Sequence, residues 1–255
     1  MMPLHCESYG HGHPLIILHG LFGSLENWRT LSKTFSQSFQ VFALDQRNHG
    51  RSPHSDVFNY RVMVEDVREF VQLHSLSPTH LLGHSMGGKT AMQFAVSYPE
   101  KVDKLIVVDI APKVYPPEHD AIFAALFSLD VRGLRSRQQA DTALAGKIPD
   151  LALRQFLLKN LEREAPGGFR WRINLDAIHE NYAEILKGLE GTGQFHHPTL
   201  FIRGGNSGYI HPEDLPAIKA IFPQAQLVTI PHTGHWVHAE APQEFAGTVL
   251  NFLAG

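Results

Sequence analysis

Short apolar runs that alternate with helical periodicity constrain the fold of this chain more than any other feature. Runs typical of buried strands occur at 15–18, 41–44, 80–82, 105–110, 199–202 and 226–230. Most of the intervals between them have apolar residues at helical spacing, as at 60–73 and 86–97. A regular succession of strands and helices requires right-handed crossovers between parallel strands. We therefore predict the α/β class, with a doubly wound, mostly parallel sheet.

The alternation is interrupted once, after the strand at 105–110. Residues 111–197 contain no convincing buried strand, and this interval is far longer than an ordinary connection. Within it, apolar spacing predicts amphipathic helices at 121–129, 151–161 and 175–189. We expect residues 1–110 and 198–255 to form one core, with 111–197 inserted into it as a helical lid.

The composition indicates the class of protein, its partners and the compartment in which we expect it. The chain has 255 residues, of which 43% are hydrophobic and 18% charged, as in an ordinary globular protein. Its formal net charge of -3 gives no reason to expect a nucleic-acid partner. Cys6 is the single cysteine, which excludes an internal disulfide and fits a reducing compartment. No apolar run approaches the length of a membrane span, so we expect a soluble, cytoplasmic protein without a membrane partner.

A candidate nucleophile follows the predicted strand at 80–82. The chain there reads Gly83-His84-Ser85-Met86-Gly87, a G-x-S-x-G pattern that opens a predicted helix. On a sharp strand-to-helix turn the serine backbone is strained, and the glycines avoid a clash across the turn. The hydroxyl is then exposed at a helix N-terminus, where backbone N–H groups favour developing negative charge. We predict Ser85 as the nucleophile.

A serine hydroxyl needs a positioned base to remove its proton, and His235 is the leading candidate. It follows the last predicted strand in a Gly-His turn, and the chain order of serine before histidine suits this kind of fold. The chain has 17 histidines, and His232 and His238 lie within three residues of His235. That spacing also allows a metal-binding interpretation, which is the weaker one. We predict proton transfer by His235, with no metal and no cofactor.

The third member must be a carboxylate that orients His235 and stabilises its positive charge. In this kind of fold the acid usually follows the strand at 199–202, but the loop 204–210 contains no acidic residue. Asp109 ends the preceding strand at the required sheet edge, so we predict Asp109. Asp214 and Glu213 are the alternatives, although both come at the start of a predicted helix, where carboxylates often cap.

An acyl-transfer transition state carries an oxyanion, which needs preorganised donors. The backbone N–H of Met86, directly after the nucleophile, is the first predicted donor. The second is the N–H of Leu21, after His19-Gly20, with Phe22 as the alternative if the turn is displaced by one residue. The side chains of Leu21, Phe22 and Met86 are expected to form an apolar wall, and Phe22 is a candidate substrate-binding residue.

Several motifs together resemble the α/β-hydrolase superfamily and, more narrowly, the YbfF-type bacterial esterases. They are His19-Gly20-Leu21-Phe22-Gly23, Asp45 to Ser52, Gly83 to Lys89, Asp109-Ile110-Ala111-Pro112, Gly204-Gly205-Asn206-Ser207 and His235 to Glu240. The resemblance implies hydrolysis of small-molecule acyl esters, or of acyl-CoA thioesters. It also implies a triad of Ser85, His235 and an acid after the sixth strand, which is Asp109. The run Asp45 to Ser52 is expected to hold a loop near the pocket.

The predicted lid is expected to select the substrate. Trp171 and Arg172 are candidate substrate-binding residues, because the guanidinium could hold a carboxylate or phosphate, although a salt bridge within the lid is an equal interpretation. Four apolar residues are candidates for pocket or core, namely Phe123, Phe127, Phe156 and Leu157. The same triad and lid could also support carbon–carbon bond hydrolysis of a diketone, or cofactor-free perhydrolysis. A non-enzymatic interaction module would require a degraded catalytic set, which this chain does not have.

Overall fold

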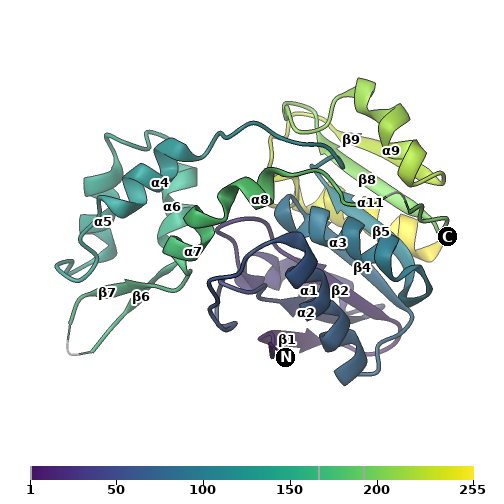
Figure 1. The fold of residues 1–255 in the computed structure, drawn as a ribbon, viewed down its shortest axis with the longest axis horizontal. Coiled ribbons are helices and arrows are strands. Elements are labelled where there is room, and N and C mark those ends of the chain that lie inside the picture. Colours follow the sequence, from purple (N-terminus) through teal and green to yellow (C-terminus); the bar gives the residue numbers. More distant parts are fainter. Residues whose placement is uncertain (1, 166, 192) are drawn as a thin grey trace.

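A seven-stranded sheet organises the chain, which is described for residues 2–165, 167–191 and 193–255 of a computed structural model. Only its first strand runs antiparallel to its neighbour. In spatial order the strands are β1 (Cys6–Tyr9), β3 (Gln40–Leu44), β2 (Pro14–Leu18), β4 (Thr79–His84), β5 (Val102–Val108), β8 (Thr199–Gly204) and β9 (Ala225–Ile230). Helices lie on both faces of the sheet (Figure 1), so the predicted doubly wound α/β architecture is confirmed.

Two apolar layers hold the helices against the sheet. Ile16 and Leu81 face α2 (Tyr60–Leu73) and α3 (Met86–Ser97). Their chain neighbours Leu15 and Leu82 face α1 (Arg29–Phe35) and α11 (Pro242–Ala254), because successive strand side chains point to opposite faces. The helices of the core are α1 (Arg29–Phe35), α2 (Tyr60–Leu73), α3 (Met86–Ser97), α9 (Leu215–Ile221), α10 (Val237–Glu240) and α11 (Pro242–Ala254). Short 3₁₀ turns are η1 (Leu25–Trp28), η2 (Pro99–Lys101) and η3 (Pro212–Asp214).

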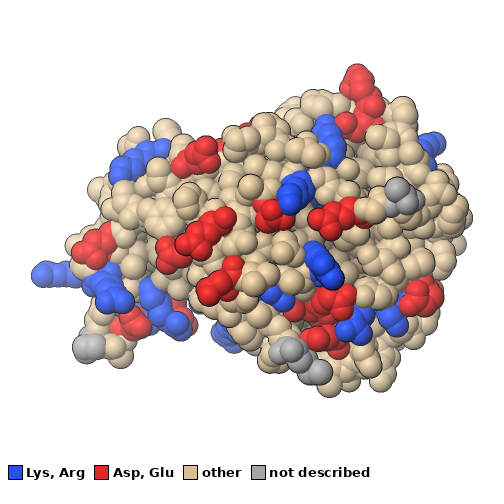
Figure 2. Space-filling model, viewed as in Figure 1, with Lys and Arg blue, Asp and Glu red and all other residues tan. Residues whose placement is uncertain are grey.

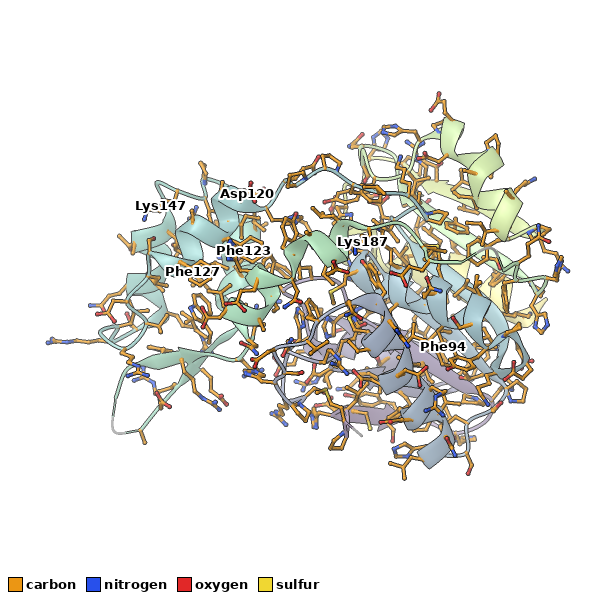
Figure 3. All side chains as sticks on the ribbon, viewed as in Figure 1. Phe94, Asp120, Phe123, Phe127, Lys147 and Lys187 are labelled. Atoms are coloured by element: carbon orange, nitrogen blue, oxygen red, sulfur yellow. The ribbon has the colours of Figure 1, made fainter. Side chains whose placement is uncertain are left out.

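The segment 111–197 leaves the sheet after β5 and returns to it at β8; its residues 166 and 192 lie outside the described chain. It contains α4 (Asp120–Phe127), α5 (Arg137–Leu144), α6 (Leu151–Leu158), β6 (Leu161–Arg163), β7 (Phe169–Trp171), α7 (Leu175–Glu180) and α8 (Tyr182–Leu186). Figure 3 labels Phe123 and Phe127 on α4, of which Phe123 is buried and Phe127 exposed. Phe123 belongs to an apolar cluster that continues into Phe22 and Met86 of the core.

The predicted elements are found with a few differences. The predicted helices 60–73 and 86–97 coincide with α2 and α3, and the predicted helix 175–189 is divided into α7 and α8. Periodicity does not predict β1, α5 or the hairpin β6–β7. The first is a short, partly exposed edge strand with no apolar alternation, and the hairpin strands have only three residues each. Such short elements depend on their neighbours more than on their own pattern.

On the face seen in Figure 2, acidic and basic side chains are interspersed over both the core and the inserted segment. This face therefore has no large patch of a single charge. Within the described ranges, no helix has the length and apolar character that crossing a membrane would require.

Candidate active site

The turn between β4 and α3 places Ser85 at the carboxyl edge of the sheet. Its backbone has φ 52° and ψ -119°, a conformation that L-residues rarely adopt. Side chains at the flanking glycines would overlap with the backbone across the turn, Gly83 with Gly87 and Gly87 with His19. The close packing therefore requires glycine at both positions, and it holds the strained serine at the N-terminus of α3.

Asp109 and His235 lie together at the same edge of the sheet. Asp109 directly follows β5, is fully buried and has φ 50°. Its Oδ2 lies 2.8 Å from Nδ1 of His235, and its Oδ1 accepts the N–H of Gly204 at 2.9 Å. The hydroxyl of Ser207 also donates to Oδ2. The carboxylate is thus held by three donors, and it fixes the orientation of the imidazole ring.

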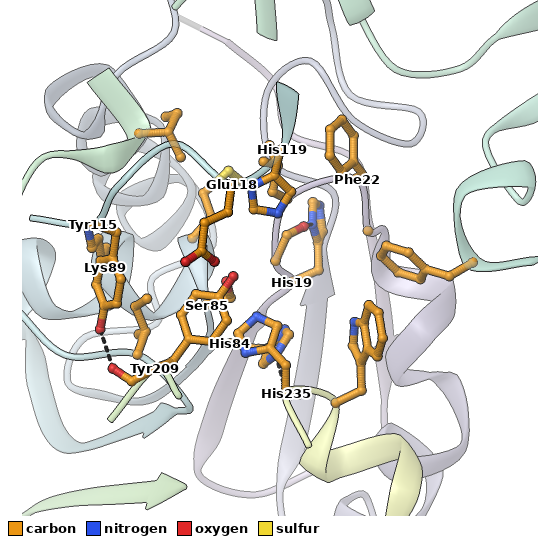
Figure 4. A pocket seen from close by; sticks show the side chains of 18 of the residues that line it. His19, Phe22, His84, Ser85, Lys89, Tyr115, Glu118, His119, Tyr209 and His235 are labelled. Atoms are coloured by element: carbon orange, nitrogen blue, oxygen red, sulfur yellow. Dashed lines mark hydrogen bonds between the residues drawn. The ribbon is translucent and has the colours of Figure 1, made fainter. Parts of the chain in front are cut away.

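The histidine ring is also held on its flat face and through its backbone. The ring of Tyr209 stacks on that of His235 with centroids 4.0 Å apart. Nε2 of His84 donates to the carbonyl of His235 at 2.9 Å, as drawn in Figure 4. Ser85 and His235 line the same pocket, and no hydrogen bond joins their side chains in this structure.

The two alternative acids lie elsewhere. Asp214 pairs with Lys113, with Oδ2 2.6 Å from Nζ, and it accepts the backbone N–H of His211 at 2.8 Å. Glu213 is exposed in η3, which directly precedes α9. Neither residue contacts His235. Asp214 caps the turn η3 through its bond to the backbone N–H of His211, the kind of helix-start role that its position in the sequence suggests.

The two histidines near His235 in the sequence, His232 and His238, lie in different environments. His232 is exposed, and the buried ring of His238 stacks on Trp28 with centroids 4.3 Å apart. Burial lowers the pKa of His238 to about 3 and that of His19 to about 4, so both rings are neutral near pH 7. Among the described residues, His232, His235 and His238 do not form a group whose ligand atoms lie close enough together to hold one metal ion.

The loop before η1 contains one backbone N–H that is free to bind a ligand and one that is already hydrogen-bonded. The N–H of Phe22 donates to Nε2 of His49 at 3.2 Å. Within the described ranges, the N–H groups of Leu21 and Met86 have no acceptor. His49 belongs to the run Asp45 to Ser52, which is tied to α2 by the buried Arg47–Asp66 ion pair, with Nε 2.6 Å from Oδ2. The run therefore holds the loop near the pocket, as expected.

A pocket with a cavity volume of about 90 Å³ surrounds Ser85. The core contributes Leu21, Phe22 and Met86 to its lining, and the segment 111–197 contributes Tyr115, Glu118, His119, Ile122, Leu153, Phe156, Tyr182, Ile185 and Leu186. Figure 4 shows residues from both parts converging on Ser85.

Of Phe22, Trp171 and Arg172, which the sequence predicts as substrate-binding residues, the structure brings Phe22 to the pocket and leaves the other two outside its lining. Trp171 ends β7 and packs on the apolar cluster of the inserted segment. Arg172 pairs with Glu26, with Nη1 3.0 Å from Oε1, and lies in a separate cleft. Among the apolar candidates Phe156 lines the pocket, whereas Phe123 and Leu157 are buried among apolar neighbours.

Two charged pocket residues are not apparent from the sequence. Lys89 is buried on α3, and its ammonium donates to the carbonyls of Leu186, at 3.2 Å, and of Lys187. No carboxylate of the described chain pairs with it, and burial lowers its pKa to about 7. Glu118, which is exposed, lies near Ser85 in Figure 4. Lys89 lies one helical turn after Ser85, within the same motif, and this position is the only feature of the sequence that could have indicated a place near the pocket.

The comparisons with known proteins agree with this geometry. Residues 13–242 match the family described as alpha/beta hydrolase fold. The chain is 41% identical over 248 residues to a mouse protein named sn-1-specific diacylglycerol lipase ABHD11, covering 94% of this chain and 80% of the relative. It is 36% identical to esterase YbfF of Escherichia coli, covering 97% and 95%. A solved structure titled marine microorganism esterase superposes with a TM-score of 0.97 at 46% identity, covering 99% and 100%.

Proposed function

This chain belongs to the α/β-hydrolase family, and from that premise we propose that it is a serine ester hydrolase that acts on small to medium acyl esters through an acyl-enzyme on Ser85. One observation carries the proposal. Ser85, on its strained turn, shares a pocket with His235, whose Nδ1 lies 2.8 Å from the buried carboxylate of Asp109. This is the arrangement that serine acyl transfer needs.

The proposed reaction has two half-reactions. His235 takes the proton of Ser85 through Nε2 as Oγ attacks the acyl carbonyl, and it then gives that proton to the leaving alcohol or thiol. Asp109 accepts the Nδ1 hydrogen bond throughout, which holds the ring and stabilises its positive charge. Water, activated by the same histidine, then attacks the acyl-enzyme and releases the acid.

The oxyanion is held by two backbone N–H groups, those of Met86 and Leu21. Both lack an acceptor among the described residues, whereas the N–H of Phe22 is already donated to His49. This difference supports Leu21 over Phe22 as the second donor. The N-terminus of α3 adds its positive end to the site.

The pocket walls support an acyl ester as substrate. The segment 111–197 acts in this proposal as a lid whose apolar side chains receive the acyl chain, among them Ile122, Leu153 and Phe156. Acyl-CoA thioesters are within the proposed class, because the same attack expels a thiol. Carbon–carbon bond hydrolysis and perhydrolysis would use the same residues, but no observation favours either.

The test is a panel of p-nitrophenyl acetate, butyrate and octanoate together with acyl-CoA substrates of matched length. We expect wild-type turnover of the esters and its loss in Ser85→Ala. Ser97→Ala, at the exposed end of the same helix α3, is the matched control and should retain activity. Hydrolysis that is equal in wild type and Ser85→Ala, or absent from every ester and thioester, would exclude the proposal.

A further inference from the structure

A second cluster of ligating side chains lies at the amino edge of the sheet, opposite Ser85. His13 directly precedes β2, His80 is the second residue of β4, and Asp103 is the second residue of β5. These three strands are neighbours in the order β2-β4-β5. Five residue steps along β4 separate His80 from Ser85, which is roughly 16 Å of strand. The cluster is therefore separate from the pocket.

A register shift brings the third residue into this cluster. Thr79 pairs with Val102 and His80 pairs with Lys104, so Asp103 is the extra residue in β5. Such a bulge redirects a side chain that would otherwise alternate with its neighbours. One ligand atom from each of His13, His80 and Asp103 lies within 4.8 Å of the other two.

The polar atoms of the cluster are poorly satisfied. Nδ1 of His80 and Nε2 of His13 are both buried, and neither has a hydrogen-bond partner among the residues that the structure describes. Oδ2 of Asp103 lies 2.9 Å from Nε2 of His13, but the two atoms are not aligned as a hydrogen bond. Buried polar groups without partners are rare in proteins, and an absent ion is one physical explanation for them.

The electrostatics allow a cation. A neutral imidazole has one nitrogen with a lone pair, so the buried ring of His80 can act as a ligand through that nitrogen. Lys104 opposes cation binding by its charge, but its ammonium donates to the carbonyls of Phe252 and Leu253, at 3.2 and 3.0 Å. Those carbonyls lie in the last turn of α11, where the helix dipole partly offsets a positive charge.

We propose that His13, His80 and Asp103 bind a divalent transition-metal ion of the zinc class. Two imidazoles and one carboxylate are a ligand set that zinc prefers, with a fourth position open to water. Bonds of about 2.0–2.2 Å would draw the ligand atoms to roughly 3.3 Å from one another, which small side-chain rotations can supply. The ion would join the starts of three adjacent strands and so stabilise the core.

The experiment measures zinc binding to the full chain, by competition with a chromophoric chelator, together with the melting temperature. We expect one site per chain in wild type and a rise in Tm of ~5 °C at saturation. His13→Ala and Asp103→Asn should each weaken the site at least tenfold and abolish the rise. Their side chains are 37% and 38% exposed, so the variants should fold, which circular dichroism checks.

The controls separate this site from other histidines. His11→Ala, at an exposed residue outside the cluster, should bind zinc as wild type does. Binding should also persist in His235→Ala, because the pocket is not involved. Magnesium should not raise Tm, because imidazole ligands do not suit it. The proposal is overturned if His13→Ala and Asp103→Asn bind zinc as tightly as wild type, or if His235→Ala loses the site.

Discussion

The carboxyl edge of the sheet and the segment 111–197 both line the pocket, but they form their parts of it in different ways. At the edge, the backbone itself sets the geometry, with Phe22, Ser85 and Asp109 at φ values of 60°, 52° and 50°. The inserted segment contributes side chains such as Phe156 and Tyr182 from helices that pack on the edge. Backbone strain persists only where the surroundings enforce it. Chemistry at the edge should therefore respond sharply to mutation, and the inserted segment should adjust selectivity.

The largest effect that we expect in this comparison is that of Asp109→Asn. Loss of the carboxylate favours the wrong tautomer of His235 and removes the stabilisation of its positive charge, so kcat should fall by about 10⁴. Single-turnover and steady-state kinetics on one p-nitrophenyl ester measure this. Asp214→Asn is the matched control, and it should change kcat by less than about threefold, since that carboxylate pairs with Lys113. The opposite ranking would transfer the role of the acid to Asp214.

Much of the edge could be predicted from the sequence, because its constraints are local. The close packing around Ser85 requires the glycines on either side of it. The loop 204–210 contains no acidic residue, which makes Asp109 the predicted acid. The preference for Leu21 as the proposed second donor rests on the hydrogen bond from the backbone N–H of Phe22 to Nε2 of His49, and a contact between residues 27 positions apart has no local signature in the sequence. The sequence could therefore leave Leu21 and Phe22 only as alternatives.

The inserted segment could be predicted only as a set of helices. Trp171 and Arg172 have the chemistry of substrate contacts, but the pairing of β6 with β7 and the ion pair with Glu26 place them outside the pocket. The burial of Lys89 depends on carbonyls almost a hundred residues later in the chain. Such contacts follow from how helices pack on the core, and periodicity does not contain that information.

Lys89 joins the two regions, and its effect should be intermediate. Its pKa is lowered from 10.5 to about 7 in the folded chain, so between these values the unfolded chain binds more protons. The stability of wild type should therefore rise with pH in that window, relative to a variant that lacks the amine. Between about pH 7 and 9, the free energy of unfolding of wild type should therefore increase by ~2 kcal/mol relative to that of Lys89→Met.

Urea unfolding at several pH values measures this difference. Lys187→Met is the matched control, because its ammonium is exposed and pairs only with Glu184 on the surface. The difference between that variant and wild type should stay constant over the same window. A constant difference for Lys89→Met as well would show that the ammonium remains charged in the folded chain and is fully compensated by the carbonyls of Leu186 and Lys187.

Phe156 tests whether the inserted segment adjusts selectivity. Its ring lines the pocket and lies 5.5 Å from that of Trp236. Phe156→Ala removes apolar contact with a longer acyl chain, so kcat/KM for the octanoate ester should fall by about tenfold relative to the acetate ester. Phe127→Ala, at an exposed phenylalanine of α4 outside the pocket, should leave that ratio unchanged. Equal ratios in the two variants would mean that the acyl chain binds elsewhere.

Arg172 should give the smallest effect. Its guanidinium pairs with Glu26 and lies in a different cleft from Ser85, so Arg172→Ala should change kcat/KM for neutral esters by less than about threefold. Glu26→Gln removes the other half of the pair and should have an equally small effect. The informative comparison adds a substrate with a carboxylate or phosphate in its leaving group. A loss above tenfold for that substrate alone, in Arg172→Ala but not in Glu26→Gln, would show that the cleft extends the pocket and that Arg172 binds the anion, as the sequence suggests.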